Sequence, residues 1–169
     1  MKGIVLFMSK AGSTKEYAKW ISEGTGFPLH DLNENKRPDL DDADVIIIGS
    51  WILASKMVAG SWIRKNWNDM KGKKVILFST SGAKPDFILK KEFLEASLPD
   101  DIRNNVDYLP LQGRFRKENL NLLYRSLLGL ASRMFKEDRL VKDLKEGVDG
   151  VKKENLEDLF ELVNDIKRG

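Results

Sequence analysis

A hydroxyl-rich loop near the amino terminus is the first candidate for chemistry. It follows an apolar run at residues 3–8, precedes a stretch with helical spacing, and comprises Ser9-Lys10-Ala11-Gly12-Ser13-Thr14. Backbone N–H groups and the positive end of a helix dipole attract anions, and Gly12 allows a close backbone approach. The loop therefore predicts a phosphate site, although it lacks the Gly-x-Gly-x-x-Gly and Gly-Lys-Ser/Thr patterns. The alternative is that Ser13 only caps the helix.

Two further loops follow apolar runs of the same kind. One comprises Ser50-Trp51-Ile52-Leu53-Ala54, and the other comprises Thr80-Ser81-Gly82-Ala83. A tryptophan among small and apolar residues can cover a flat aromatic ring. In open α/β sheets, ligands bind beyond the carboxyl ends of the strands. We therefore expect the three loops to surround one pocket.

Short apolar runs alternate with helical patterns along the whole chain. The expected strands are residues 3–8, 27–32, 45–49, 74–79 and 106–111, and the expected helices are 13–23, 58–70, 88–97, 119–135 and 154–167. Continuous apolar runs of this length are typical of parallel strands that are buried on both faces. The pattern predicts an open parallel sheet with helices on both faces, and a connection without regular structure over 136–153.

The amino-acid composition excludes several kinds of functional site. The 169 residues include no cysteine and one histidine, which excludes disulfides, thiolate metal sites, cysteine nucleophiles and multi-histidine sites. We expect His30 to be a strand-end residue. Acidic and basic residues nearly balance, at 26 and 29, and no nucleic-acid motif is present, so we expect no nucleic-acid partner. No leader or membrane-spanning run is visible, which favours a cytoplasmic location.

The phosphate loop resembles that of the flavodoxin-like family, which has the pattern Ser/Thr-x-Thr-Gly-x-Thr. The sequence here is Ser9-x-Ala11-Gly12-x-Thr14, which departs from the pattern only at Ala11. Residues 44–51 also look like the family's third strand and its first flavin-covering loop. The resemblance implies a single domain over 1–169. It also implies an open five-stranded parallel sheet in the order 2-1-3-4-5, with flavin mononucleotide (FMN) as the cofactor.

The same resemblance assigns roles to the loop residues. Those that would hold the phosphate are Ser9, Lys10, Gly12, Ser13 and Thr14, with Ala11 between them. The isoalloxazine ring would lie between two sets, which are Ser50, Trp51, Ile52, Leu53 and Ala54, and Thr80, Ser81, Gly82 and Ala83. Many flavodoxins have a tyrosine in the later loop, which is absent here, and Phe87 is the nearest aromatic residue.

The net charge of the chain bears on which branch of the family it resembles. Electron-carrier flavodoxins are usually strongly acidic, whereas this chain has a formal charge of +3. The segment that begins at Gln112 loosely resembles the menaquinone-dependent protoporphyrinogen dehydrogenase branch. In that interpretation Arg114, Arg116 and Lys117 would bind the carboxylates of an acidic substrate. The alternative is a solvated basic loop.

The segment 114–136 is expected to be basic, amphipathic and helical. Its apolar stripe suits a core helix, and the alternative is peripheral contact with a membrane or with a quinone-bearing partner. Three functions remain open at this point. They are an FMN-dependent oxidoreductase acting on a porphyrinogen or quinone, a flavodoxin-type electron carrier, and a non-redox phosphate- or nucleotide-binding module.

Overall fold

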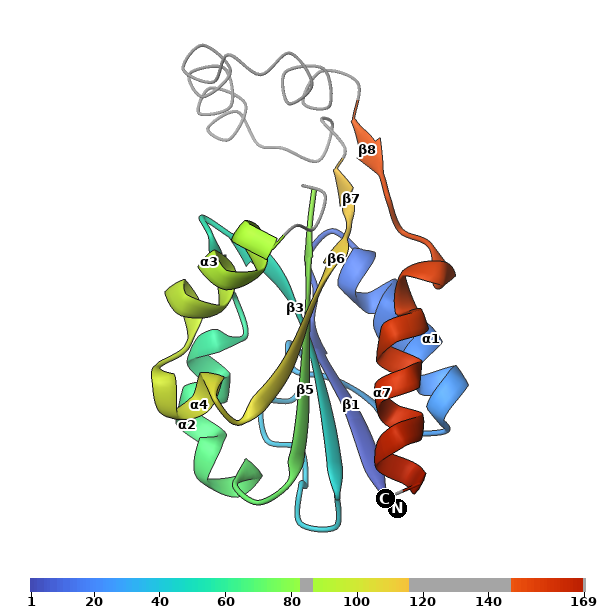
Figure 1. Cartoon of the computed structure of the whole chain (residues 1–169), viewed down its shortest axis with the longest axis vertical. Coiled ribbons are helices and arrows are strands. Elements are labelled where there is room, and N and C mark those ends of the chain that lie inside the picture. Colours follow the sequence, from blue (N-terminus) through green and yellow to red (C-terminus); the bar gives the residue numbers. More distant parts are fainter. Residues whose placement is uncertain (83–86, 116–146, 169) are drawn as a thin grey trace.

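A five-stranded parallel sheet organises the molecule (Figure 1). The computed structural model describes residues 1–82, 87–115 and 147–168, with only the main chain described at 87–90 and 115. The strands in spatial order are β2 (Leu29–Asp31), β1 (Gly3–Met8), β3 (Val45–Leu53), β5 (Lys74–Ser81) and β6 (Val106–Gln112). Counted along the chain without the short β4, this is the expected order 2-1-3-4-5, so that prediction is confirmed. His30 lies in β2, as expected.

The central strands are apolar on both faces because helices cover both faces. Ile46 and Ile48 of β3 belong to the core cluster that includes Trp62, whereas Ile47 belongs to the cluster that includes Tyr17. Successive side chains of a strand point to opposite faces, so one apolar run supplies both clusters. Burial of each large apolar side chain stabilises the fold by roughly 1.5–3 kcal/mol.

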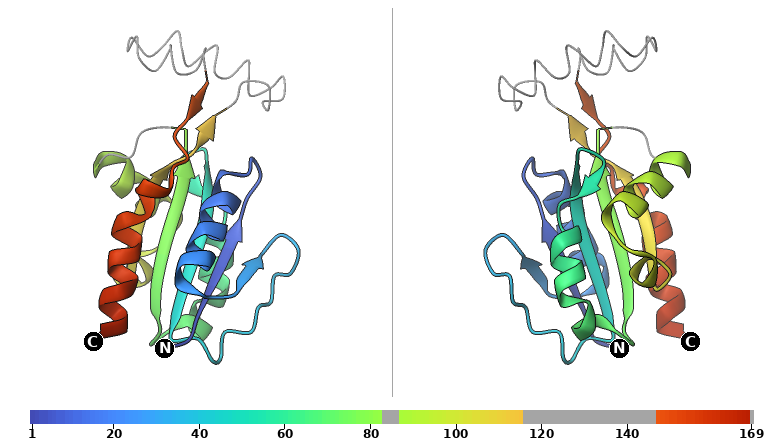
Figure 2. Two further views of the ribbon diagram at one scale, coloured as in Figure 1. Left: turned by 90° about the vertical axis from the view of Figure 1, so that its right-hand side faces the viewer. Right: turned by 90° about the vertical axis from the view of Figure 1, so that its left-hand side faces the viewer.

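Two helical layers flank the sheet, as both panels of Figure 2 show from opposite sides. One layer consists of α1 (Ser13–Thr25) with the short 3-10 helix η2 (Lys153–Leu156) and α7 (Glu157–Arg168). The other consists of α2 (Gly60–Met70), α3 (Phe87–Ser97) and α4 (Asp100–Arg103). Among the described residues, no helix combines the length and apolar character that crossing a bilayer requires.

A short two-stranded ribbon extends the fold beyond the carboxyl end of the sheet. Strand β7 (Arg114–Phe115) pairs antiparallel with β8 (Val148–Asp149), and we call this ribbon the stalk. Figure 1 shows it above β6. The sequence predicted neither strand. Strand β7 lies at the start of the segment 114–136, which was expected to be helical, and β8 lies in the stretch expected to lack regular structure. The expected helix over 119–135 lies outside the described residues.

Strand β3 continues four residues past its expected end and turns back into β4 (Lys56–Met57). The turn residues Ala54 and Ser55 have φ angles of 47° and 63°. Positive φ at both central residues defines a type I′ turn, which normally carries Asn-Gly. The absence of that signal explains why the hairpin was not predicted. A left-handed conformation costs a residue other than glycine about 1–2 kcal/mol.

Replacing Ala54 with Asn and Ser55 with Gly together should stabilise the protein. We expect the free energy of unfolding to rise by about 1 kcal/mol because the strain at the turn is relieved. Urea unfolding of the two proteins measures the difference. The control is Ser61→Gly in the exposed first turn of α2, which should destabilise the protein. A turn variant less stable than the parent would contradict the strained hairpin.

Candidate functional site

Helix α1 begins at the carboxyl edge of the sheet without a side-chain cap. Its N-cap residue is Gly12, with a φ of 96°, and no side-chain hydrogen bond from the described residues caps the helix. The first N–H groups of a helix have no acceptor inside it, so they remain as donors here. A Cβ atom built on Gly12 meets nothing within 4 Å, which shows open space beside those donors. The start of α1 is therefore suited to an anion.

Ser13 does not cap α1, so that alternative is wrong. It is the first helical residue, and its Oγ accepts a hydrogen bond from the main-chain N–H of Arg114 at 2.9 Å. The next residue, Thr14, shares a 2.8 Å hydrogen bond between its Oγ1 and that of Thr80 at the end of β5. A hydroxyl has one donor and two acceptor sites, so Ser13 still has its own proton to donate. The start of α1 therefore meets the end of β5 at the carboxyl edge of the sheet.

The end of β3 joins the same edge through Trp51. The Nζ atom of Lys10 lies 5.8 Å from the centroid of the Trp51 ring, which is a cation–π contact between the loop after β1 and the end of β3. Ser50 is buried, and its hydroxyl accepts the N–H of Ala59 at 3.0 Å and donates to the carbonyl of Trp51. Ser50 thus shapes the loop from inside the protein.

The remaining predicted ring residues have different environments. Ile52 is half-buried and packs against the core, Leu53 is half-buried, and Ala54 is exposed at the hairpin turn. Ser81 is partly exposed and its carbonyl accepts the N–H of Gly113 at 2.6 Å, while Gly82 is exposed. Ala83, like Arg116 and Lys117, lies outside the described residues.

Arg114 bridges two carboxylates beside the start of α1. Its Nε donates to Asp149 Oδ2 at 2.6 Å, and its Nη1 donates to Glu16 Oε2 at 3.1 Å. The hydrogen bond to Asp149 raises the pKa of Arg114 further above its usual value, so the guanidinium is a permanent cation. Its charge is compensated within the chain, and its role in substrate binding stays a prediction. Sequence reasoning missed Glu16 and Asp149 because they are 98 and 35 positions from Arg114.

Tyr17 fixes the chain that returns from the stalk. Its hydroxyl contacts the carbonyl oxygens of Gln112 at 2.8 Å and Gly150 at 3.2 Å. It also accepts hydrogen bonds from Asn155 Nδ2 at 2.6 Å and from the Lys152 N–H at 3.3 Å. Burial raises the pKa of Tyr17, so the neutral phenol persists at neutral pH. The helical spacing identified Tyr17 as a core residue but not as a hydrogen-bonding centre.

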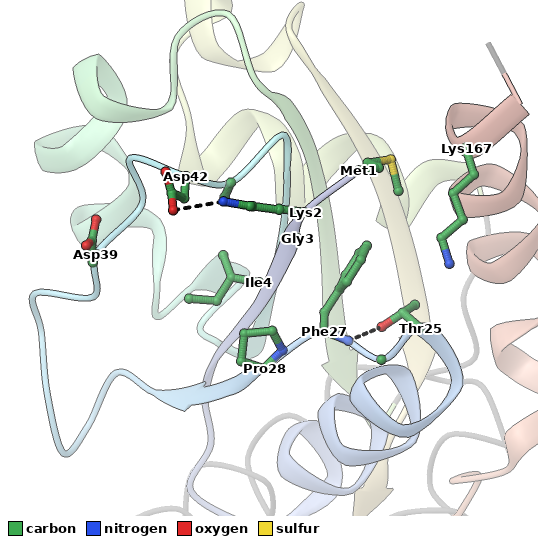
Figure 3. Close-up of a pocket in the computed structure, with 12 residues that line it drawn as sticks. Met1, Lys2, Gly3, Ile4, Thr25, Phe27, Pro28, Asp39, Asp42 and Lys167 are labelled. Carbon is green, nitrogen blue, oxygen red and sulfur yellow. Dashed lines mark hydrogen bonds and ion pairs between the residues drawn. The ribbon is translucent and has the colours of Figure 1, made fainter.

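A hollow of about 450 Å³ lies at the other end of the sheet (Figure 3). Phe27, Pro28 and Ile4 line it, and Lys2 at its rim forms an ion pair with Asp42. This end holds the amino ends of the strands, whereas ligands of open α/β sheets bind at the carboxyl ends. We therefore place the candidate site at the start of α1.

A family model described as the flavodoxin domain matches residues 4–141. The chain belongs to the flavodoxin family. No curated protein sequence matches it.

The chain is similar to several solved structures at low sequence identity. A flavodoxin described as WrbA-like from Agrobacterium tumefaciens is 17% identical, with a TM-score of 0.50, and the match covers 80% of this chain and 99% of that one. A flavoprotein in complex with FMN from Lactobacillus acidophilus is 15% identical, with a TM-score of 0.48, and the match covers 66% of this chain and 91% of that one. Oxidised flavodoxin 2 from Bacillus cereus is 17% identical, with a TM-score of 0.42, and covers 66% and 86%.

Substitution of Tyr17 by Phe should destabilise the fold more than the same change at Tyr108. Tyr108 is also buried, but the hydrogen bond given for its hydroxyl is with Ser79, at 2.6 Å. We expect losses of about 2 kcal/mol for Tyr17→Phe and about 1 kcal/mol for Tyr108→Phe, since more buried groups lose a partner at Tyr17. Urea unfolding measures both. Equal losses would show that the Tyr17 hydroxyl does not anchor the returning chain.

Proposed function

We propose that this flavodoxin-family chain binds FMN at the carboxyl edge of its sheet and acts as an FMN-dependent oxidoreductase. The observation that carries the proposal is the uncapped start of α1, with buried Ser13 and Thr14 beside the end of β5. A phosphate monoester is a dianion at neutral pH, which is the ligand that free helix N–H groups favour. Membership of the flavodoxin family supports a flavin as the group that carries this phosphate.

The residues at the start of α1 fit a phosphate without crowding. The open space at Gly12 leaves room for phosphate oxygens next to the first amides of the helix. The hydroxyls of Ser13 and Thr14 add donors, and Lys10 adds a positive charge from an exposed position. Ser9 supports the turn, because its Oγ accepts the N–H of Gly12 at 3.3 Å. In this proposal Ser9 shapes the site while residues 10–14 hold the phosphate.

The other two loops fit a flat ring. Trp51 offers an aromatic surface beside Lys10, and at the same edge Ser81 ends β5 and Gly82 follows it. The hydrogen bond between Thr14 and Thr80 holds the loop after β5 against the phosphate site. The hairpin of β3 and β4 fixes the loop that carries Trp51, since Val58 donates to the Trp51 carbonyl at 3.1 Å. The ring would therefore lie between two supported loops.

When bound, FMN supplies a ring that accepts and donates electrons, and the protein orients the ring and controls its access to water. We assign no side chain as an acid or base catalyst, because the flavin itself would carry the chemistry. The contribution of this chain is binding and positioning. Trp51 would shield one side of the flavin ring from water, and the amides of α1 would hold the phosphate.

The substrate part of the proposal is a porphyrinogen or a quinone. Its support is the basic character of this edge, where Lys10 and Lys56 are exposed. Arg116 and Lys117 follow the stalk directly in sequence. Cations at this edge favour a ligand that carries carboxylates. Turnover of a porphyrinogen by the FMN-loaded protein would support an enzyme, whereas reduction of the FMN without turnover would favour an electron carrier.

The purified apoprotein should take up FMN in a one-to-one ratio and quench its fluorescence at micromolar concentration. We expect riboflavin to bind more weakly, because it lacks the phosphate that the start of α1 would hold. Fluorescence titration measures both affinities. AMP serves as a mononucleotide without a flavin. If AMP bound tightly and FMN did not, the chain would be a nucleotide-binding module without a flavin.

Trp51→Ala should weaken FMN and riboflavin by the same factor, about 3- to 10-fold, because both ligands share the ring. The matched control is Trp20→Ala. Trp20 is also half-buried, and Lys153 Nζ lies 5.6 Å from its ring centroid, but it is on the α1 face away from the loops. The control should leave both affinities within twofold. Unchanged binding by Trp51→Ala would remove Trp51 from the ring site.

A further inference from the structure

The segment that follows β6 contacts the first turn of α1 at two residues. The main-chain N–H of Arg114 donates to Ser13 Oγ, and the Arg114 guanidinium binds Glu16, three residues further along the helix. Gly113 lies directly before Arg114, and its N–H donates to the carbonyl of Ser81. One dipeptide therefore joins the proposed phosphate loop to the loop after β5.

The approach of this dipeptide is close enough to favour glycine at position 113. A Cβ atom there would lie 3.2 Å from the Ser81 carbonyl oxygen, 3.4 Å from Thr80 Cβ and 3.5 Å from Ser13 Cβ. The contact at 3.2 Å is tighter than ordinary van der Waals packing and involves rigid backbone. The position of the Arg114 N–H relative to Ser13 is thus set by backbone packing. Since that N–H occupies a lone pair of Ser13 Oγ, the hydroxyl proton is left for another acceptor.

Glu16 creates an electrostatic problem for any phosphate at this helix start. It lies in the first turn of α1, where its negative charge suits the helix dipole but repels a bound dianion. The guanidinium of Arg114 neutralises it at 3.1 Å, and the Arg114 side chain is only 22% exposed, which limits screening by water. Asp149 accepts a hydrogen bond from Nε of the same guanidinium, and it lies directly opposite Arg114 in the paired strands of the stalk.

We propose that Arg114 is a positioning residue of the phosphate site, which acts through Ser13 and Glu16 without touching the cofactor. This inference rests on the proposed binding of FMN at the start of α1. Arg114 directs the Ser13 hydroxyl with its main chain and cancels the charge of Glu16 with its side chain. Asp149 fixes the guanidinium in that place. The stalk thereby sets the affinity of the site for phosphate, although it lies outside the three loops.

The test compares FMN with riboflavin in charge variants of the bridge. In Arg114→Ala, two carboxylates lose their cation beside the phosphate, so we expect the Kd for FMN to rise about tenfold and that for riboflavin to change less than twofold. Adding Glu16→Gln to Arg114→Ala should recover most of the FMN affinity, since the repelling charge is gone. A purely structural role for Arg114 would show no such recovery. The FMN defect should also shrink at high salt.

Arg103→Ala is the matched control. Arg103 also binds two carboxylates, Glu95 and Asp100, and its side chain is likewise 22% exposed, but it lies in α4 away from the site. The control should leave the affinities for both flavins unchanged. If Arg114→Ala does not fold, the single variant Glu16→Gln tests the positioning role, because its amide oxygen can still accept a hydrogen bond from Arg114. We expect it to bind FMN about two- to threefold more tightly, with riboflavin unchanged.

The outcomes separate this inference from the proposed function. If the parent protein binds neither flavin, FMN binding itself is wrong. Suppose that the parent binds FMN more tightly than riboflavin. The positioning role is then wrong if Arg114→Ala weakens the binding of both flavins equally or of neither. It is also wrong if adding Glu16→Gln to Arg114→Ala restores no FMN affinity. Circular dichroism and the urea midpoint of each variant confirm that the proteins compared are folded.

Discussion

The start of helix α1 is the constraint on which the rest of the site depends. Gly12 adopts a positive φ and has no side chain, so the first N–H groups of α1 remain without a side-chain cap from the described residues. Such a start costs stability unless a ligand or water satisfies the amides. The parallel sheet brings this helix start to the edge where β3 and β5 also end. The fold therefore presents unsatisfied donors at the point where loops from three strands meet.

The surrounding contacts hold this helix start in place from three directions. Thr14 binds Thr80 at the end of β5, Ser13 accepts the N–H of Arg114 beyond β6, and Tyr17 binds the chain that returns from the stalk. Each contact joins residues far apart in sequence, so these contacts form only when the sheet and the stalk are assembled. A site held in this way is preorganised, which lowers the cost of binding a charged ligand.

Sequence patterns predicted the features of the structure that depend on residues close together in the chain. Apolar runs located the parallel strands, and the residues around Gly12 located the helix start that we propose as the phosphate site. The β3–β4 hairpin was missed because Ala54 and Ser55 adopt positive φ without the usual Asn-Gly. The Glu16–Arg114–Asp149 bridge was missed because only tertiary pairing brings these charges together. Ser13 was open to misreading as a cap, since a serine before a helix carries no mark that distinguishes the N-cap from the next residue.

The most direct test of the account is an NMR titration of the ¹⁵N-labelled apoprotein with FMN and with riboflavin. The account predicts that FMN shifts the amide resonances of Gly12, Ser13 and Thr14 strongly, and that riboflavin shifts them much less while both ligands perturb the indole of Trp51. The phosphate would then lie on the start of α1. Shifts confined to the hollow at the other end of the sheet, around Gly3 and Phe27, would contradict the account.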